Sequence, residues 1–191
     1  DLNLRFLEEL VRYFVHLGYL YLDEGVWSLS SAALQGVEDG TLVFANLEEL
    51  YQYQSRQLEA NQRFVLQILA YYGRTDGHWR AAPFLEPLVD QLARFQSDLL
   101  VQGWLRPSAQ DDVFYIDDHR RTFVRARTGE AVIDSCIDWD LEQLSCQPQP
   151  AQVERTRIYE RLYRWEQSLT RKDWIADALE LYRLQLDLAQ Q

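Results

Sequence analysis

Two stretches of the chain share the same order of hydrophobic and polar positions. In each, hydrophobic residues recur at helical spacing and the pattern ends at a glycine, Gly18 in the first stretch and Gly103 in the second. The spacing predicts an amphipathic helix over residues 4–17 and another that begins at Pro83, since proline is favoured in the first turn of a helix. Glycine readily adopts the left-handed backbone that terminates helices, so both helices are expected to end there.

The residues that follow each glycine alternate in the way that short strands do. Residues 19–29 alternate around an Asp-Glu-Gly turn, which favours a hairpin. In the second stretch, residues 113–116 and 122–124 are the expected strands of another hairpin, and a third short strand is expected at 131–133. A helix that leads into a two-stranded wing is typical of winged-helix units of the helix-turn-helix class. The chain is therefore predicted to contain two such units in tandem.

Three further helices are expected. A long one covers residues 46–72, with a break near residue 60. The proline-containing segment 148–150 indicates a linker, and the spacing of hydrophobic residues after it predicts amphipathic helices over 153–169 and 174–188.

These elements predict a fold that is mainly α with short β-hairpins. Residues 1–75 are expected to form the first winged-helix-like unit and the long helix. Residues 76–147 are expected to form the second winged-helix-like unit, and 151–191 a C-terminal helical hairpin. The chain contains no methionine and begins at Asp1, which favours a fragment of a longer protein or a sequence that lacks its methionine positions.

The charge of the chain narrows the choice of partner. Its formal net charge is -11, and 47% of its residues are hydrophobic, which is enough for a packed core. The acids outnumber the basic residues most strongly in the first 60 residues, where the only basic residues besides histidine are Arg5, Arg12 and Arg56. A phosphate backbone is repelled by such a chain unless a local basic surface overcomes the repulsion.

One segment has the charge that a nucleic-acid contact needs. Residues 119–129 contain four arginines and no acid. On the expected second hairpin they would lie on the wing, where winged helices touch the DNA backbone. The candidate nucleic-acid-binding residues are therefore Arg120, Arg121, Arg125 and Arg127.

No pattern of residues predicts a catalytic site, a metal site or a cofactor. Residues 115–118 read Tyr-Ile-Asp-Asp, which matches the metal-binding turn of reverse transcriptases, but the other elements of such an enzyme are not visible. The acids Asp134, Asp138, Asp140 and Glu142 lack the spacing of a calcium loop and favour a solvated face. There is no phosphate-binding loop, and the three histidines are isolated in the sequence.

The expected location is the cytoplasm. No hydrophobic run approaches the roughly 20 residues of a membrane span, so no membrane contact is expected, and the N-terminus has no secretory signal. Cys136 and Cys146 lie ten residues apart without the paired spacing of a zinc site, which favours free thiols in a reducing compartment.

Part of the chain resembles a known family. Residues 3–11, reading Asn-Leu-Arg-Phe-Leu-Glu-Glu-Leu-Val, resemble the lid segment after the ATPase core of STAND-class signal-transduction ATPases. Residues 25–29, Gly-Val-Trp-Ser-Leu, stand where that family has a Gly-x-Trp-x-Leu hairpin, and residues 65–74 resemble its Val-Leu helix that ends in Gly-Arg. The resemblance is best over residues 3–74. Leu4 replaces the proline of the lid motif, and the nucleotide-binding core is missing.

The resemblance implies a region C-terminal to an ATPase, whose winged helices relay the nucleotide state to effector repeats. The helix expected over residues 174–188 would suit the first such repeat. Together, the sequence predicts a non-catalytic regulatory or protein-interaction module with a protein partner or an associated ATPase. The alternative is a DNA-binding tandem winged-helix regulator that uses the arginine-rich second wing.

Overall fold

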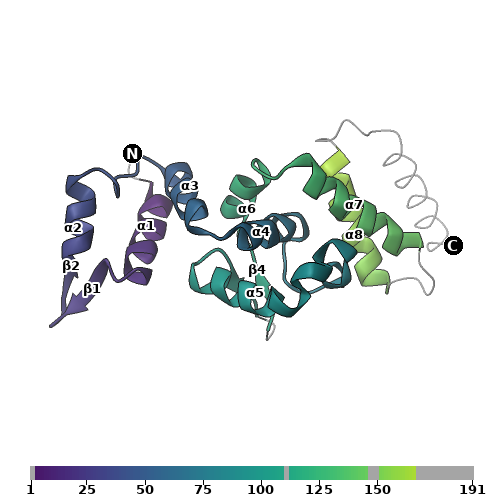
Figure 1. Cartoon of the computed structure of the whole chain (residues 1–191), viewed down its shortest axis with the longest axis horizontal. Helices are drawn as coiled ribbons and strands as arrows, with labels where there is room; N and C mark the ends of the chain where they lie inside the picture. The colour runs from purple at the N-terminus through teal and green to yellow at the C-terminus, as the bar shows by residue number, and fades with distance from the viewer. Residues whose placement is uncertain (1–2, 110–111, 146–150, 167–191) are drawn as a thin grey trace.

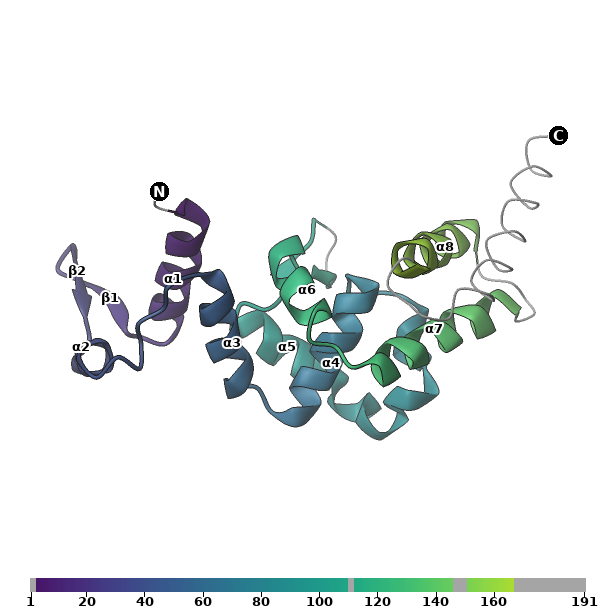
Figure 2. The same ribbon diagram turned by 90° about the horizontal axis from the view of Figure 1, so that it is seen from above.

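A computed structural model describes residues 3–109, 112–145 and 151–166. These ranges are mainly helical, with two small antiparallel sheets. Figures 1 and 2 show an elongated molecule, with a small N-terminal unit at one end and α7 and α8 at the other. The predicted fold class of mainly α structure with short hairpins is confirmed at this level.

The first unit, residues 3–45, contains two helices and a hairpin between them. Asn3 caps the first helix by accepting hydrogen bonds from the backbone of Arg5 and Phe6, and Ser30 caps the second in the same way. Gly18 has a φ of 68°, as expected for a residue that follows a helix end. The elements are α1 (Leu4–His16), β1 (Leu20–Asp23), β2 (Val26–Leu29) and α2 (Ser31–Glu38). The predicted first helix and first hairpin are confirmed.

The long helix predicted over residues 46–72 is divided in two. Leu58 adopts an extended backbone, and Glu59 begins the next helix through a capping box with Gln62. The break therefore lies beside the predicted position. The two helices are α3 (Leu47–Gln57) and α4 (Ala60–Tyr72).

The remaining elements pack around α4. Together with α3 and α4 they form the part of the molecule that we call the body, and α4 lies at its centre in Figure 1. The helix predicted from Pro83 begins as a 3-10 helix because a second proline, Pro87, cannot donate a backbone hydrogen bond inside it. The helix expected from residue 153 is confirmed over the described residues. The elements are η1 (His78–Ala81), η2 (Pro83–Gln91), α5 (Leu92–Val101), β3 (Arg106–Pro107), β4 (Phe114–Tyr115), α6 (Asp118–Arg125), α7 (Glu130–Ser145) and α8 (Gln152–Glu166).

The second hairpin differs from the one predicted. β4 pairs with β3 and not with residues 122–124, which belong to α6, and residues 131–133 belong to α7. The reason is local: Asp117 accepts hydrogen bonds from the backbone of His119 and Arg120 and so caps a helix where a turn was expected. The wing assigned to the arginines is therefore wrong. Residues 148–150 and 174–188 lie outside the described residues.

The described residues form one large core and one small one. The large core collects side chains from α3 to α8, on both sides of the unit boundary expected at residues 75 and 76. The small core is centred on Tyr13, Phe14, Leu42 and Leu50 and holds the first unit against α3. This small core covers little of the first unit, which leaves many of its hydrophobic side chains in solvent.

Candidate interaction face and buried charge clusters

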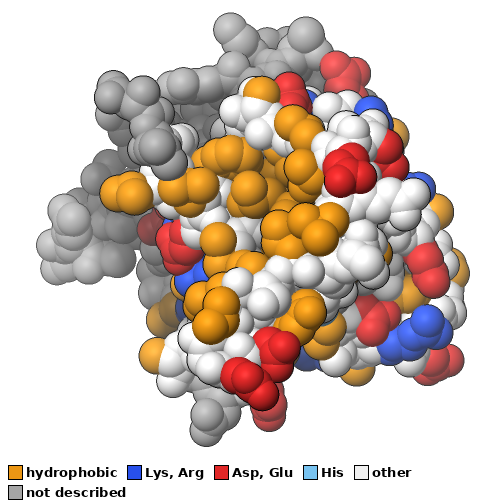
Figure 3. All heavy atoms as spheres, turned by 90° about the vertical axis from the view of Figure 1, so that its left-hand side faces the viewer, with side chains coloured by type: hydrophobic (Ala, Val, Ile, Leu, Met, Phe, Trp, Pro, Cys, Tyr) orange, Lys and Arg blue, Asp and Glu red, His pale blue; other side chains and the backbone are white. Residues whose placement is uncertain are grey.

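The exposed hydrophobic side chains are concentrated on the first unit. Of the sixteen large hydrophobic side chains that are exposed among the described residues, twelve lie between Leu4 and Val43. Figure 3 shows a broad hydrophobic area on this end of the molecule. Folded proteins rarely leave contiguous hydrophobic areas of this kind uncovered unless they bind something. Tyr21 and Val26 lie on the other side of the hairpin from Leu22 and Trp27. We call the remaining ten residues the hydrophobic face: Leu4, Val11, Val15, Leu17, Leu22, Trp27, Leu29, Leu34, Val37 and Val43.

The hairpin contributes the largest side chains of the hydrophobic face. Leu22 pairs with Trp27, and Leu20 pairs with Leu29, so these four residues lie on one side of the two-stranded sheet. Leu22 and Trp27 are 58% and 59% exposed. Two strands alone cannot cover this side, and no described element packs over the outer pair.

The two helices of the first unit add stripes of hydrophobic residues at helical spacing. On α1, Leu4, Val11 and Val15 lie on one side of the helix, whereas Tyr13 and Phe14 point into the small core. On α2, Leu34 and Val37 are exposed one turn apart. The hydrophobic face therefore extends over both helices and the hairpin.

Acidic residues border the hydrophobic face. Asp23 and Glu24 form the tip of the hairpin, and Glu38 and Asp39 end α2. The two arginines of the first unit do not neutralise them, because Arg12 pairs with Glu8 at 2.6 Å and Arg5 is directed to Glu9 and Asp117. Red side chains surround the hydrophobic area in Figure 3. The hydrophobic face is therefore bordered by negatively charged side chains.

A buried cluster of charges joins the first unit to the body. Glu9 of α1 is fully buried, and its carboxylate lies 2.6 Å from guanidinium nitrogens of both Arg106 and Arg120. Arg5 and Asp117 complete the cluster, in which Asp117 lies 3.2 Å from Arg106 and from Arg120. We call these five residues the Glu9 cluster. It ties α1 to β3 and to the start of α6, which are about one hundred residues away in the sequence.

Within the Glu9 cluster, Asp117 is held as an anion. Burial alone would raise the pKa of Asp117, but the backbone hydrogen bond from Arg120 and the charges of Arg120 and Arg106 lower it. The Arg120 guanidinium also lies over the rings of Tyr51 and Trp104, at 5.2 and 5.9 Å from their centroids. The ion pairs of the cluster are thus packed against aromatic rings.

The four arginines predicted to bind nucleic acid lie on or just after α6, and each has an interaction within the protein. Arg120 belongs to the Glu9 cluster. Arg121 donates hydrogen bonds to the carbonyl oxygens of Ala70 and Tyr71 at the end of α4. Arg127 pairs with Glu48 at 2.6 Å and lies 4.0 Å from the centroid of the Phe123 ring. Arg125 also has an interaction within the protein. The structure thus brings these residues into contacts that hold helices together.

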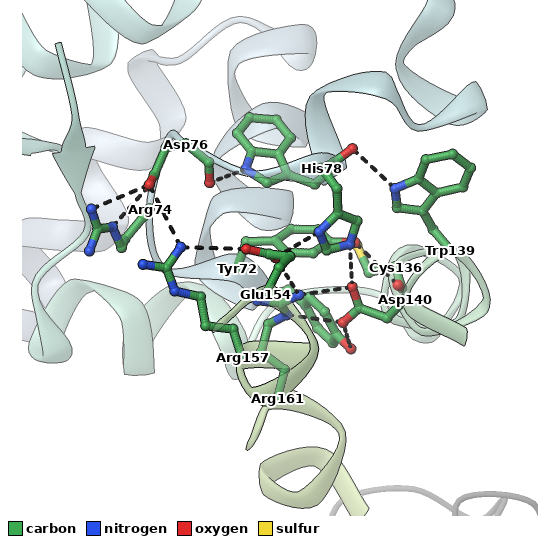
Figure 4. Close-up of polar contacts among 12 residues, drawn as sticks. Tyr72, Arg74, Asp76, His78, Cys136, Trp139, Asp140, Glu154, Arg157 and Arg161 are labelled. Atoms are coloured by element: carbon green, nitrogen blue, oxygen red, sulfur yellow. Dashed lines mark hydrogen bonds and ion pairs between the residues drawn. The ribbon is translucent and has the colours of Figure 1, made fainter. Parts of the chain in front are cut away.

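A second buried cluster lies at the opposite end of the molecule (Figure 4). The two ring nitrogens of His78 lie 2.8 Å from Glu154 and 2.7 Å from Asp140. Asp140 is fully buried and also accepts two hydrogen bonds from Arg161, both 3.0 Å long, and one from the Tyr71 hydroxyl. We call His78, Asp140, Glu154 and Arg161 the His78 cluster. It joins η1 to α7 and α8.

The His78 cluster changes the pKa values of its members. Burial alone would lower the pKa of His78, but the hydrogen bonds to Asp140 and Glu154 outweigh burial and raise it. The hydrogen bond from His78, with help from Arg161, lowers the pKa of Glu154 to about 2. Since a carboxylate engages each ring nitrogen, the imidazole has no free nitrogen for a substrate while α8 is in place. No sequence pattern predicts this cluster, because its members are spread over more than 80 residues.

The other acidic patterns have structural partners. Asp117 of the Tyr-Ile-Asp-Asp segment caps α6 and belongs to the Glu9 cluster, while Asp140 of the acidic run belongs to the His78 cluster. Within residues 3–109, 112–145 and 151–166, no group of three or more acidic, histidine or cysteine side chains is placed to hold a metal ion. Cys136 is a buried free thiol, and Cys146 lies outside these ranges.

No helix in the described part of the chain is both long and apolar enough to cross a membrane. No protein-family model matches the chain, and no curated protein or solved structure proves similar to it. The resemblance of residues 3–74 to the STAND-class lid therefore stays a prediction.

Proposed function

We propose that this chain is a non-catalytic protein-interaction module, in which a winged-helix-like first unit binds a protein partner through its hydrophobic face. The observation that carries the proposal is the concentration of exposed hydrophobic side chains on residues 4–43. Interfaces between proteins have hydrophobic and aromatic residues at their centre and polar residues at their rim. The hydrophobic face has this composition, with Trp27 and Leu22 at the hairpin and acids around it.

The partner surface that fits this face is an amphipathic helix with basic residues beside its hydrophobic stripe. Such a helix would cover Leu22 and Trp27 with its hydrophobic residues. Its lysines or arginines would meet Asp23, Glu24, Glu38 and Asp39 at the border. A second copy of the chain fits less well, because two identical acidic borders would face each other.

The Glu9 cluster supports a regulatory role for this contact. It connects α1, which carries part of the hydrophobic face, to α6 and β3 of the body through buried ion pairs. A partner bound to the first unit would therefore act on the body through a stiff ionic contact and not through a flexible linker. This arrangement suits a module that relays the state of an associated ATPase, as the family resemblance implies.

The contacts of the arginines favour a protein partner over DNA. A phosphate backbone needs guanidinium groups that are free to pair with it. Arg120 is 3% exposed and Arg121 donates to backbone oxygens, so both would have to leave contacts within the protein. The unchanged chain is therefore not expected to bind DNA.

Two designed peptides test the proposed function. Both are 18-residue helices with the same leucine stripe, and the polar positions are lysine in one and glutamate in the other. We expect the leucine–lysine peptide to bind the full chain at least about tenfold more tightly than the leucine–glutamate peptide, measured by fluorescence anisotropy. Changing Leu22→Ser and Trp27→Ser together should weaken this binding about tenfold or more, since it removes the largest hydrophobic contacts.

A matched control separates the face from hydrophobic residues in general. Val89 and Val101 are 54% and 60% exposed and lie outside the first unit. The Val89→Ser/Val101→Ser variant should bind the leucine–lysine peptide as the unchanged chain does. If neither peptide binds, or if both variants bind equally well, the proposed function is wrong. Sedimentation of the chain alone tests the second copy: a stable dimer that Leu22→Ser/Trp27→Ser dissociates would assign the face to self-association.

A further inference from the structure

A pocket of about 330 Å³ lies where the first unit meets the body. Its walls come from the end of α1 and the start of β1, from α3, and from the residues at the end of α5. The proposed function makes no use of it. Its volume is large enough for a side chain or a small ligand.

Aromatic rings and hydroxyl groups dominate the walls. Tyr13, Tyr19, Tyr53 and Trp104 line the pocket, and the rings of Tyr13 and Tyr53 meet edge to face with centroids 6.2 Å apart. Among the described residues, none provides a hydrogen-bond partner for the hydroxyl groups of Tyr13, Tyr19 or Tyr53. These hydroxyl oxygens are thus available to accept hydrogen bonds from a ligand.

Three glutamine amides add hydrogen-bonding groups to the same walls. Gln54, Gln57 and Gln102 line the pocket, and Gln54 is only 4% exposed. The side-chain oxygen of Gln54 is buried and has no hydrogen-bond partner in the described part of the chain. A buried acceptor without a donor is unfavourable, so a ligand that supplies a donor after a small side-chain adjustment would bind more tightly.

The charges around the pocket select against anions. Neither lysine nor arginine lines it, and its one basic side chain is that of His16. The chain carries a net charge of -11, which draws cations to its surface. Electron-rich rings attract cations at their faces, and a water-poor site strengthens that attraction.

We propose that this pocket binds a guanidinium group. A guanidinium is planar, stacks on aromatic rings, is more weakly hydrated than an ammonium and presents several donors in one plane. Those donors match the tyrosine hydroxyls and the Gln54 oxygen. Leu17 lines the pocket and also belongs to the hydrophobic face, so an arginine of a partner bound to that face would reach it. The partner as the source of the group rests on the proposed function, whereas the chemistry of the pocket does not.

Three small ligands with the same butyl chain test the chemistry of the pocket. n-Butylguanidinium, its uncharged analogue n-butylurea and n-butylammonium are titrated into the full chain, with backbone amide chemical shifts as the readout. We expect n-butylguanidinium to bind at least about tenfold more tightly than n-butylurea, with n-butylammonium between them. The largest shifts should lie at residues 13–19, 53–57 and 102–104. Equal binding of the guanidinium and the urea, or shifts elsewhere only, would overturn the proposal.

A pair of variants on α3 tests the role of the buried acceptor. Gln54→Leu keeps the size of the side chain and removes the acceptor, so it should weaken n-butylguanidinium binding about tenfold. Gln52→Leu on the exposed side of the same helix should leave the binding unchanged. Should both variants bind like the original chain, Gln54 is not part of the site.

A leucine–arginine peptide distinguishes the two sources of the group. If it binds more tightly than the leucine–lysine peptide, and Gln54→Leu removes the difference, the guanidinium comes from a partner protein. If n-butylguanidinium binds as expected but the arginine peptide shows no gain, the pocket holds a free guanidinium compound. Failure of the hydrophobic face would appear as loss of all peptide binding with the small-ligand preference intact.

Discussion

Glu9 and Asp140, the two buried carboxylates among the described residues, hold opposite ends of the molecule in different ways. Each is fully buried and paired with arginine. Glu9 shares its arginines with Asp117 and has no histidine in its cluster, whereas Asp140 also holds His78. The first unit is therefore fixed by carboxylate–guanidinium pairs without a histidine. The attachment of α8 depends in addition on the protonation of His78.

Removal of the Glu9 charge should give the largest effect. In Glu9→Gln, Arg120 stays buried with only Asp117 to compensate it, which should lower the free energy of unfolding by about 3–5 kcal/mol. Urea denaturation measures the loss. Glu8→Gln, which breaks an exposed pair with Arg12, should change stability by less than about 1 kcal/mol. Equal effects of the two variants would contradict the central role of the Glu9 cluster.

Asp140→Asn should have a somewhat smaller effect, about 2–4 kcal/mol, because Arg161 and His78 retain Glu154 as a partner. Hydrogen exchange should show faster opening of α8 and η1 and no change in α1. If α1 opens as well, the two clusters are coupled and the comparison between them fails.

The pH dependence of stability should distinguish the two ends. The pKa of His78 is raised in the folded protein, so its contribution is complete below pH 6.5 and is lost as the pH rises through the folded value. The pKa of Glu154 is lowered from 4.5 to about 2, so its contribution is present above pH 4.5 and is lost as the pH falls toward 2. Protection of α8 from hydrogen exchange should therefore be greatest between about pH 4.5 and 6.5. In His78→Gln the decline on the alkaline side should disappear, and α1, whose cluster contains no histidine, should show no alkaline decline in either protein.

The smallest effect is expected from the arginines outside the clusters. Arg125→Ala/Arg127→Ala removes an exposed pair with Glu48 and should lower stability by about 1 kcal/mol or less. Duplex DNA at low salt should bind neither this variant nor the unchanged chain. Salt-sensitive binding that the variant loses would restore the DNA-binding hypothesis and identify α6 as its site.

The sequence predicted those elements whose signals are local. The helix over residues 4–17 and the hairpin over 19–29 follow from the spacing of hydrophobic residues, a capping Asn3 and Gly18. The prediction of the second hairpin was wrong because the sequence of residues 122–124 is compatible both with a strand and with the buried side of a helix. The N-terminal cap at Asp117 and the buried contacts of Arg120 and Phe123 stabilise the helix over the strand.

The charge clusters lay beyond sequence reasoning for a different reason. Glu9 and Arg120 are 111 residues apart, and His78 and Glu154 are 76 apart, with no periodicity that connects them. The arginine-rich segment stands out in the sequence, but the residues next to it do not indicate its partners. A burial estimate for α1 would have helped, since an acid on the same helix as Tyr13 and Phe14 must find a cation when it is buried.

Cys136 is a chemical probe for opening of the large core. Its thiol is buried in the core that it shares with Ile158 and Leu162 of α8, and burial raises its pKa, so alkylating reagents cannot reach a thiolate in the closed molecule. Modification must wait until this core opens. In a Cys146→Ser variant, the rate at which Cys136 is alkylated, measured by mass spectrometry, therefore reports how often the core around Cys136 opens.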